Sequence, residues 1–120
     1  MSGTDENRTR VVDERLTLGN GFSTADRRFL VEALAPLAPH LLSWSPEQAE
    51  VVVTVKNRDG DEQKVTLEAR LPQVPVLVAS AHHRDLDRAL VEARKELIRQ
   101  IDDAKDKREP HKGRAHRPTG

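Results

Sequence analysis

Three features of the chain predict an α+β fold built on one four-stranded sheet. Two segments rich in β-branched residues flank the turn Arg58-Asp59-Gly60-Asp61, which predicts a β-hairpin. The segment 76–101 begins as an apolar strand and continues as an amphipathic helix. Ser23 and Asp26 predict the start of an earlier helix. The predicted order is β-α-β-β-β-α, with two helices packed on one face of the sheet.

The N-terminal segment supplies the first strand in this prediction. Residues 1–10 are polar, and we expect them to be frayed. The apolar residues of Val11–Leu18 favour a strand that ends at the turn Gly19-Asn20-Gly21. The folded domain is therefore expected to begin at residue 11.

The first predicted helix begins just after Ser23. Ser23 and Asp26 have the spacing of a capping box, and Phe22 precedes them as a hydrophobic staple. Pro36 and Pro39 are expected to kink or end the helix, because each lacks a backbone N–H and crowds the preceding turn. The residues expected to point inward are Phe29, Leu30, Ala33, Leu34 and Leu37.

The hairpin consists of the predicted strands Glu50–Asn57 and Glu62–Leu71, with Gly60 suited to the turn. Side chains alternate between the two faces of a strand, so one face of the sheet is apolar and available to the helices. The opposite face is expected to be more exposed, and it includes Thr54, Lys56, Thr66, Glu68 and Arg70.

The last strand is predicted over Val74–Ala81. All the residues of Val76–Ala79 are apolar, so both faces of the strand carry apolar side chains. This pattern predicts burial on much of both faces. Asp85 then has the side chain of a helix N-cap. The apolar residues of the following helix recur every three or four positions and are Leu86, Ala89, Leu90, Ala93, Leu97 and Ile101.

The opposite face of this last helix is basic. At about 100° per residue, Arg88, Lys95 and Arg99 lie in a narrow arc away from the apolar residues. Arg84 precedes the helix. A row of cations suits a phosphate backbone. The same pattern also fits a solvated helix face, because acidic residues lie nearby at Glu92, Asp102 and Asp103.

Length and charge indicate one domain with two tails, divided as 1–10, 11–108 and 109–120. The 20 basic and 20 acidic residues give no net charge, so affinity for nucleic acid must come from local segregation of charge. The segment 105–120 shows such segregation, with six Lys or Arg against Asp106 and Glu109. We expect its last part to be a flexible basic tail.

Several classes of protein are disfavoured by composition. There is no cysteine, and hence no disulfide or thiol chemistry, and the chain has neither a membrane-length apolar segment nor a signal-peptide core. A cytoplasmic protein is therefore expected. The aromatic residues are Phe22, Phe29 and Trp44, too few for base-stacking platforms, so RNA would be bound mainly through its backbone.

Residues 76–101 resemble the C-terminal half of the ribosome hibernation-promoting factor and ribosome-associated inhibitor A family. The shared features are a strand ending in Ala-Ser, a turn, an Asp-initiated helix and a Leu, Arg, Gln, Ile pattern near its end. The matching positions are Ala79, Ser80, His83, Asp85, Leu86, Ala89, Leu97, Arg99, Gln100 and Ile101. The tail element His111-Lys112-Gly113 is also similar, and the element order is shared over 11–114.

The resemblance implies a short-form hibernation factor that occupies the small-subunit channel between head and body, where messenger and transfer RNA would sit. Its basic residues would contact ribosomal RNA phosphates, and pairing of ribosomes through a C-terminal dimerisation domain is not expected. The RNA-binding residues expected from the resemblance, the helix face and the tail are Arg84, Arg88, Lys95, Arg99, Lys105, Lys107, Arg108, Lys112 and Arg114.

Four departures from the family pattern affect affinity more than fold. The family has a tyrosine where this chain has Asp87 and a lysine where it has Glu96, and Asp102-Asp103 interrupts the basic end of the helix. The first helix offers Arg27 and Arg28 in place of the family's lysines.

Metal binding and catalysis are not predicted. His82-His83 beside Asp85, and the tail pair His111 and His116, contain metal-ligand types but no preorganised set. The carboxylates fall on turns and solvent faces without a desolvated pair, and no phosphate loop or nucleophile motif is present. We therefore expect no enzyme activity, no metal, no cofactor and no small-molecule substrate.

Two alternatives to a ribosome-bound factor stay open. The element order is also similar to that of double-stranded-RNA-binding domains, which pack two helices on a sheet. From another class, Pro36–Trp44 would serve as an apolar docking surface for a protein partner, with Leu37, Leu41 and Trp44 as contacts. Trp44 suits a residue that closes the core at the helix–strand junction better than it suits a partner contact. We expect a monomer or weak dimer that does not bind a membrane.

Overall fold

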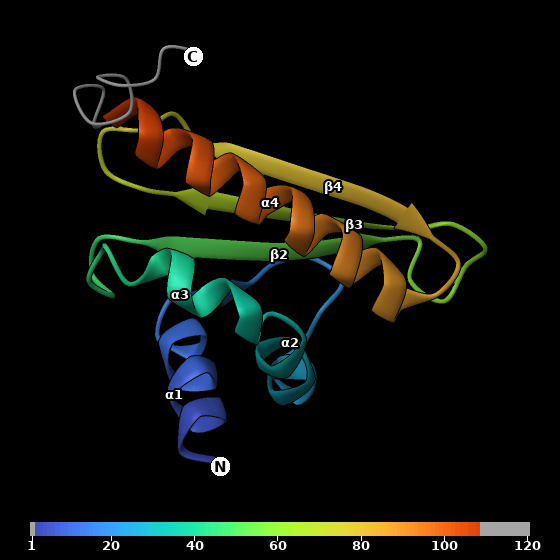
Figure 1. Ribbon diagram of the computed structural model, residues 1–120. Helices are drawn as coiled ribbons and strands as arrows, with labels where there is room; N and C mark the ends of the chain where they lie inside the picture. The colour runs from blue at the N-terminus through green and yellow to red at the C-terminus, as the bar shows by residue number, and fades with distance from the viewer. Residues whose placement is uncertain (1, 109–120) are drawn as a thin grey trace.

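In the computed structural model, helices pack on one side of a four-stranded sheet (Figure 1). The structure describes the backbone of residues 2–108 and the side chains of residues 7–106. The domain is α+β, as predicted, but a further helix precedes the first strand. The elements are α1 (Ser2–Asp13), β1 (Leu16–Leu18), η1 (Thr24–Asp26), α2 (Arg27–Ala33), η2 (Ala35–Leu37), α3 (Ala38–Leu41), β2 (Glu50–Lys56), β3 (Gln63–Arg70), β4 (Leu77–His83) and α4 (Leu86–Arg108), where η denotes a 3-10 helix.

The strands lie in the order β1-β2-β3-β4. β1 is parallel to β2, and the other two pairings are antiparallel. The predicted hairpin is confirmed, with Val53 opposite Leu67 in its centre. Its turn differs in detail, because the positive φ angles belong to Asn57 (57°) and Asp59 (70°) and not to Gly60. Asn and Asp tolerate this left-handed conformation better than other residues with side chains.

One face of the sheet is covered and the other is open. α4 crosses β3 and β4 on the covered face, with α2 and α3 beside it (Figure 1). The prediction that the last strand is buried on both faces is wrong: Val76 and Val78 are 51% and 50% exposed. No element among the described residues covers that face, so only the alternate residues Ala79 and Ala81 enter the core.

The predicted strand Val11–Leu18 is wrong over its first half. Helix α1 continues to Asp13 and includes most of the segment that we expected to be frayed. Val12 has almost no exposed surface and packs in the core, where α1 contacts η2 and α3. The short strand β1 begins only at Leu16. Tertiary packing of this one valine outweighs the weak preference of the segment for a strand.

Arg15 holds α1 to the rest of the domain although it is buried. Its Nη1 donates to the Val11 carbonyl (2.8 Å), and its Nη2 donates to the Trp44 carbonyl (2.7 Å). Its own carbonyl accepts from the N–H of Val51 on β2 (2.8 Å). Hydrogen bonding is what makes the burial of a charged side chain tolerable. Trp44 is buried, as expected for a residue that closes the core.

The first predicted helix is broken into four short pieces from η1 to α3, which confirms the effect expected of Pro36 and Pro39. Its start is fixed as predicted, because the Asp26 carboxylate accepts from the Ser23 N–H (2.9 Å). The prediction that Phe29 points inward is wrong, because its side chain is 37% exposed. Val31 is buried instead. The interruption of the helix changes which side chains face the sheet.

Two contacts join the hairpin to the loop before α2. Arg58 in the turn donates from both Nη atoms to the two Asp26 oxygens (2.9 Å each), and its guanidinium lies 5.1 Å from the centre of the Phe22 ring. This pairing holds the pKa of Asp26 well below its ordinary range and raises that of Arg58. Gly21 in the same loop has a φ of 92° and lies so close to Val55 that a Cβ atom would clash.

Candidate nucleic-acid interface

The outer face of α4 presents Arg88 and Lys95 along its N-terminal half, with the exposed Glu92 between them. Asp85 caps the helix as predicted, because its Oδ1 accepts from the Asp87 N–H (3.3 Å). Leu90 and Leu97 are fully buried against the sheet, which turns Arg88 and Lys95 outward into solvent. These two cations and Arg84 have no ion-pair partner among the described residues. The exposure of Arg88 and Lys95 on one face of α4 agrees with the helical spacing.

Arg99 belongs to the same face but is already paired. It donates to both carboxylate oxygens of Glu96 and, at 3.2 Å, to Asp103. The Glu96 hydrogen bonds raise the pKa of Arg99, and the bonds from Arg99 and then Gln100 lower the pKa of Glu96 to about 2. Glu96 therefore stays ionised near neutral pH. A phosphate that binds Arg99 must compete with two carboxylates.

The charge of the outer face changes from positive to negative toward the C-terminal end of α4. Asp102, Asp103 and Asp106 are exposed there, and Asp102 accepts a contact from His40 Nδ1 on α3 (2.9 Å). Lys105 does not offset the negative charge of these aspartates on the outer face, because its side chain lies against the core. Its Nζ is 5.4 Å from the centre of the Trp44 ring. Phosphate contacts are thus better placed on the N-terminal half of the helix.

Four of the predicted RNA-binding residues lie outside what the structure describes in side-chain detail. They are Lys107 and Arg108, whose backbone is at the end of α4, and Lys112 and Arg114 in the predicted tail. Their role stays a prediction.

Arg94 and Arg10 are two further cations that the sequence pattern did not indicate. Arg94 is half-buried and donates from Nη1 to the carbonyl of Ala33 (3.0 Å), which ties α4 to α2. Arg10 is exposed on α1, in a segment that we had expected to be frayed. The contact of Arg94 depends on how two helices pack together, and the position of Arg10 depends on the unexpected helix α1, so the spacing of charges alone indicates neither.

The apolar docking surface predicted at Pro36–Trp44 is wrong in its key residues. Leu37, Leu41 and Trp44 are buried in the core, and only Leu42 is strongly exposed (63%). The shortness of the helices here turns three apolar side chains inward. This segment stabilises the domain and does not offer those residues to a partner.

The structure also describes the candidate metal and acid-base groups. The described residues contain no cluster of three or more potential metal ligands. His83 accepts a hydrogen bond from the Asp85 N–H (3.0 Å) and so helps to begin α4. Hydrogen bonds lower the pKa values of Asp26, Glu47 and Glu96, which favours their ionised forms. A general acid needs a shift in the other direction.

The family of the chain follows from its sequence. A family model described as "Sigma 54 modulation protein / S30EA ribosomal protein" matches residues 22–109, well over half of the 120 residues. The chain belongs to this family. No curated protein sequence matches it. The family match confirms the hibernation-factor resemblance.

Two solved structures are similar to the fold. A ribosomal subunit interface protein from Coxiella burnetii is 14% identical, with a TM-score of 0.53, over 76% of this chain and 97% of that one. The N-terminal domain of Protein Y from Thermus thermophilus is 20% identical, with a TM-score of 0.48, over 72% of this chain and 91% of that one. At these identities, the first likeness shows a shared fold.

Family membership supports a ribosome-associated function in hibernation and translation regulation, with the ribosome as partner and the cytoplasm as location. The family is not a known enzyme family. No helix in the described part of the chain is long and apolar enough to cross a membrane.

Proposed function

We propose that this protein inactivates idle ribosomes by binding the small subunit near the channel for messenger and transfer RNA. The observation that supports this most is the family match over 22–109. Binding there would be steric inhibition, because messenger and transfer RNA would be excluded from an occupied channel. No catalytic step is required.

The proposed contacts are ionic and centre on the N-terminal half of α4. Arg88 and Lys95 are exposed on the outer face, Arg84 is exposed just before the helix, and none of the three has an ion pair among the described residues. Arginine pairs with phosphate through a bidentate guanidinium, and lysine acts as a point charge. Arg99 contributes less, since Glu96 and Asp103 already occupy its guanidinium. Lys107, Arg108, Lys112 and Arg114 remain proposed contacts near the end of the chain, and Lys105 would have to leave the Trp44 ring to become one.

The experiment is co-sedimentation of the purified protein with purified small subunits and whole ribosomes across a salt series. We expect binding at low salt that weakens as salt rises, because phosphate contacts release condensed counterions. Translation of a reporter message by the same ribosomes should fall as the protein is added. Absence of binding at low salt by folded protein would overturn the proposal.

Binding to bare duplex RNA distinguishes a ribosome-specific factor from the remaining alternative, a general binder of double-stranded RNA. The likeness of this fold to double-stranded-RNA-binding domains, which recognise duplex shape and backbone, stays a prediction. We expect ribosomes to be bound more tightly than duplex RNA of equal nucleotide concentration. Equal affinity for both would favour a general duplex-RNA binder. Sedimentation of the free protein would test the predicted monomer or weak dimer.

A further inference from the structure

A groove of about 500 Å³ lies between α1 and α3, and part of its lining is apolar. The apolar residues that line it are Val11, Ala38, Pro39 and Leu42. Leu42 is 63% exposed, more than any other large apolar side chain in the described part of the chain. Pro39 is also exposed, and Val11 is half-buried. Apolar side chains that gather along a hollow, and do not lie singly on a flat surface, are typical of a binding groove.

The two prolines explain why Leu42 faces solvent. Because Pro36 and Pro39 interrupt the helix, α3 spans only Ala38–Leu41. Leu41, its last residue, is fully buried, and the backbone of Leu42 is still helical. Successive side chains of a helix diverge by about 100°. Leu42 therefore points away from the core that Leu41 enters.

Arg15 fixes the two walls of this groove to each other. Its buried side chain lines the groove and donates to the Val11 carbonyl on α1 and to the Trp44 carbonyl beyond α3. Helix α1, which forms one wall, lies outside the residues 22–109 that match the family. A groove whose walls are already joined loses little conformational entropy when a ligand binds.

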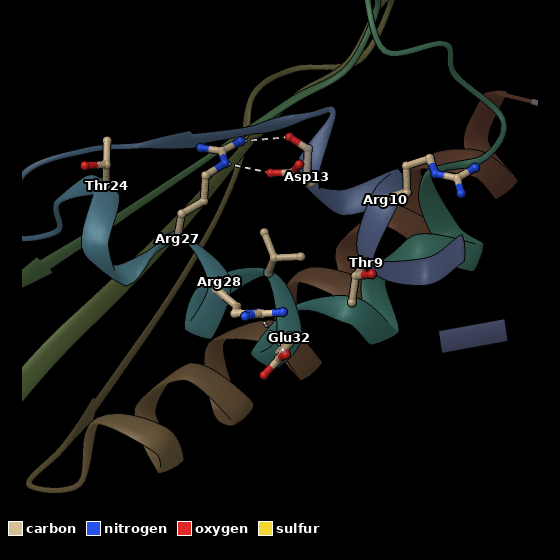
Figure 2. A pocket seen from close by; sticks show the side chains of 8 residues that line it. Thr9, Arg10, Asp13, Thr24, Arg27, Arg28 and Glu32 are labelled. Carbon is tan, nitrogen blue, oxygen red and sulfur yellow. Dashed lines mark hydrogen bonds and ion pairs between the residues drawn. The ribbon is translucent and has the colours of Figure 1, made fainter. Parts of the chain in front are cut away.

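Unpaired positive charge lies beside the apolar lining. Arg8 and Arg10 line the groove, are exposed, and form no ion pair with any residue of 7–106. Figure 2 shows the Arg10 side chain pointing away from α2. The acidic residue in the lining, Glu14, lies 3.6 Å from Arg15. The lining is thus complementary to a ligand that combines apolar side chains with carboxylates.

We propose that the groove between α1 and α3 docks an acidic amphipathic helix of a protein partner. The apolar side chains of the partner pack against Leu42, Pro39 and Val11, and its carboxylates pair with Arg8 and Arg10. Amphipathic helices bind apolar grooves in this way, through residues spaced by three or four positions. No aromatic residue lines the groove, so it offers an RNA base no ring for stacking. This binding is a further function, separate from the proposed ribosome contacts of α4.

The test uses a synthetic peptide of about four helical turns, with Leu at i, i+3, i+4 and i+7 and Glu at most other positions. It is added to the isotope-labelled full chain and followed by NMR. We expect saturable shifts of the Leu42 and Val11 methyl resonances and of the Arg10 Nε–H. The methyl resonances of Val78, which is 50% exposed on the open face of the sheet, should not move.

Two further ligands separate the outcomes of this titration. A peptide with Lys in place of each Glu should give no saturable shift of the Leu42 methyl resonances, because its charges repel the two arginines. Equal shifts with both peptides would overturn the proposed acidic partner. Shifts with a short oligouridine but not with the acidic peptide would assign the groove to RNA and overturn the proposal. So would an absence of shifts at about 1 mM acidic peptide.

A pair of variants tests the contacts themselves. We expect Leu42→Ser with Arg10→Gln to weaken binding of the acidic peptide by about tenfold or more, because one apolar anchor and one charge are lost. The matched control is Val78→Ser with Lys56→Gln, at exposed positions outside the groove, and it should bind like the unmodified protein. Circular dichroism checks that both variants are folded. Equal peptide affinities of the two variants would overturn the groove proposal, whereas absence of ribosome binding by the unmodified protein would overturn only the proposed function.

Discussion

Leu97 is a buried side chain at the contact between α4 and the sheet. We expect Leu97→Ala to lower the free energy of unfolding by about 2 to 5 kcal/mol, because it leaves a cavity that its rigid neighbours fill only in part. Urea denaturation measures this. Arg88→Ala, on the exposed side of the same helix, is the control and should change stability by less than about 0.5 kcal/mol. A loss that small for Leu97 would mean that the helix faces are assigned backwards.

Glu96 gives the domain a defined sensitivity to acid. Bonds from Arg99 and then Gln100 lower its pKa from 4.5 to about 2. Because the folded value lies below the ordinary one, the stabilisation is complete above pH 4.5 and disappears as the pH falls toward 2. We expect Glu96→Gln to flatten the pH dependence of the unfolding free energy in this window, as measured by denaturation at a series of pH values. Glu92→Gln, at an exposed position of α4, is the control, and a curve unchanged by Glu96→Gln would contradict the assignment.

At the scale of elements, the outer face of α4 decides the proposed ribosome binding. We expect Arg88→Ala with Lys95→Ala to weaken binding strongly and to lower the salt slope by about two contacts, whereas Arg99→Ala alone should have a smaller effect. The fold should be unchanged, because these side chains fill no cavity. Co-sedimentation and circular dichroism measure the two properties.

The matched control for this pair is Lys56→Ala with Lys64→Ala, on the open face of the sheet. Removal of the chain after Arg108 should cost less than the α4 variant, because a predicted flexible segment loses conformational entropy on binding. If the α4 variant binds like the unmodified protein while the truncated chain does not bind, the tail is the RNA ligand and the helix face is merely solvated.

Sequence patterns predicted elements best where local preference and packing agree. The hairpin and α4 have strong periodicity, and both appear close to the expected bounds. Val76 and Val78 were misassigned because an apolar strand pattern does not reveal whether a second layer covers it. α1 was missed because its single buried valine gives almost no periodicity. The cations of α4 could be predicted, but the pairing of Arg99 depends on side-chain conformations that spacing does not fix.

At the scale of the whole molecule, Arg15 makes α1 part of one cooperative unit. We expect Arg15→Met to lower the free energy of unfolding by about 1.5 to 3 kcal/mol, because the Trp44 carbonyl loses a charged donor. Trp44 is the only tryptophan, so its fluorescence reports on this contact. Fluorescence and circular dichroism should give one coincident transition. An earlier fluorescence transition would show that α1 separates before the sheet unfolds.

The change of sign along the outer face of α4 has a consequence for the approach to a partner. The chain has no formal net charge, but Arg84, Arg88 and Lys95 lie toward one end of a long helix and Asp102 and Asp106 toward the other. The outer face of this helix therefore has a local electric dipole, although Asp87 and Glu92 near the first end and Lys107 and Arg108 near the second reduce it. In the field of a polyanion, the dipole experiences a torque that turns the cationic end inward before contact. Association with ribosomes would then be faster than random orientation allows, and this acceleration would vanish when ions shorten the range of the field.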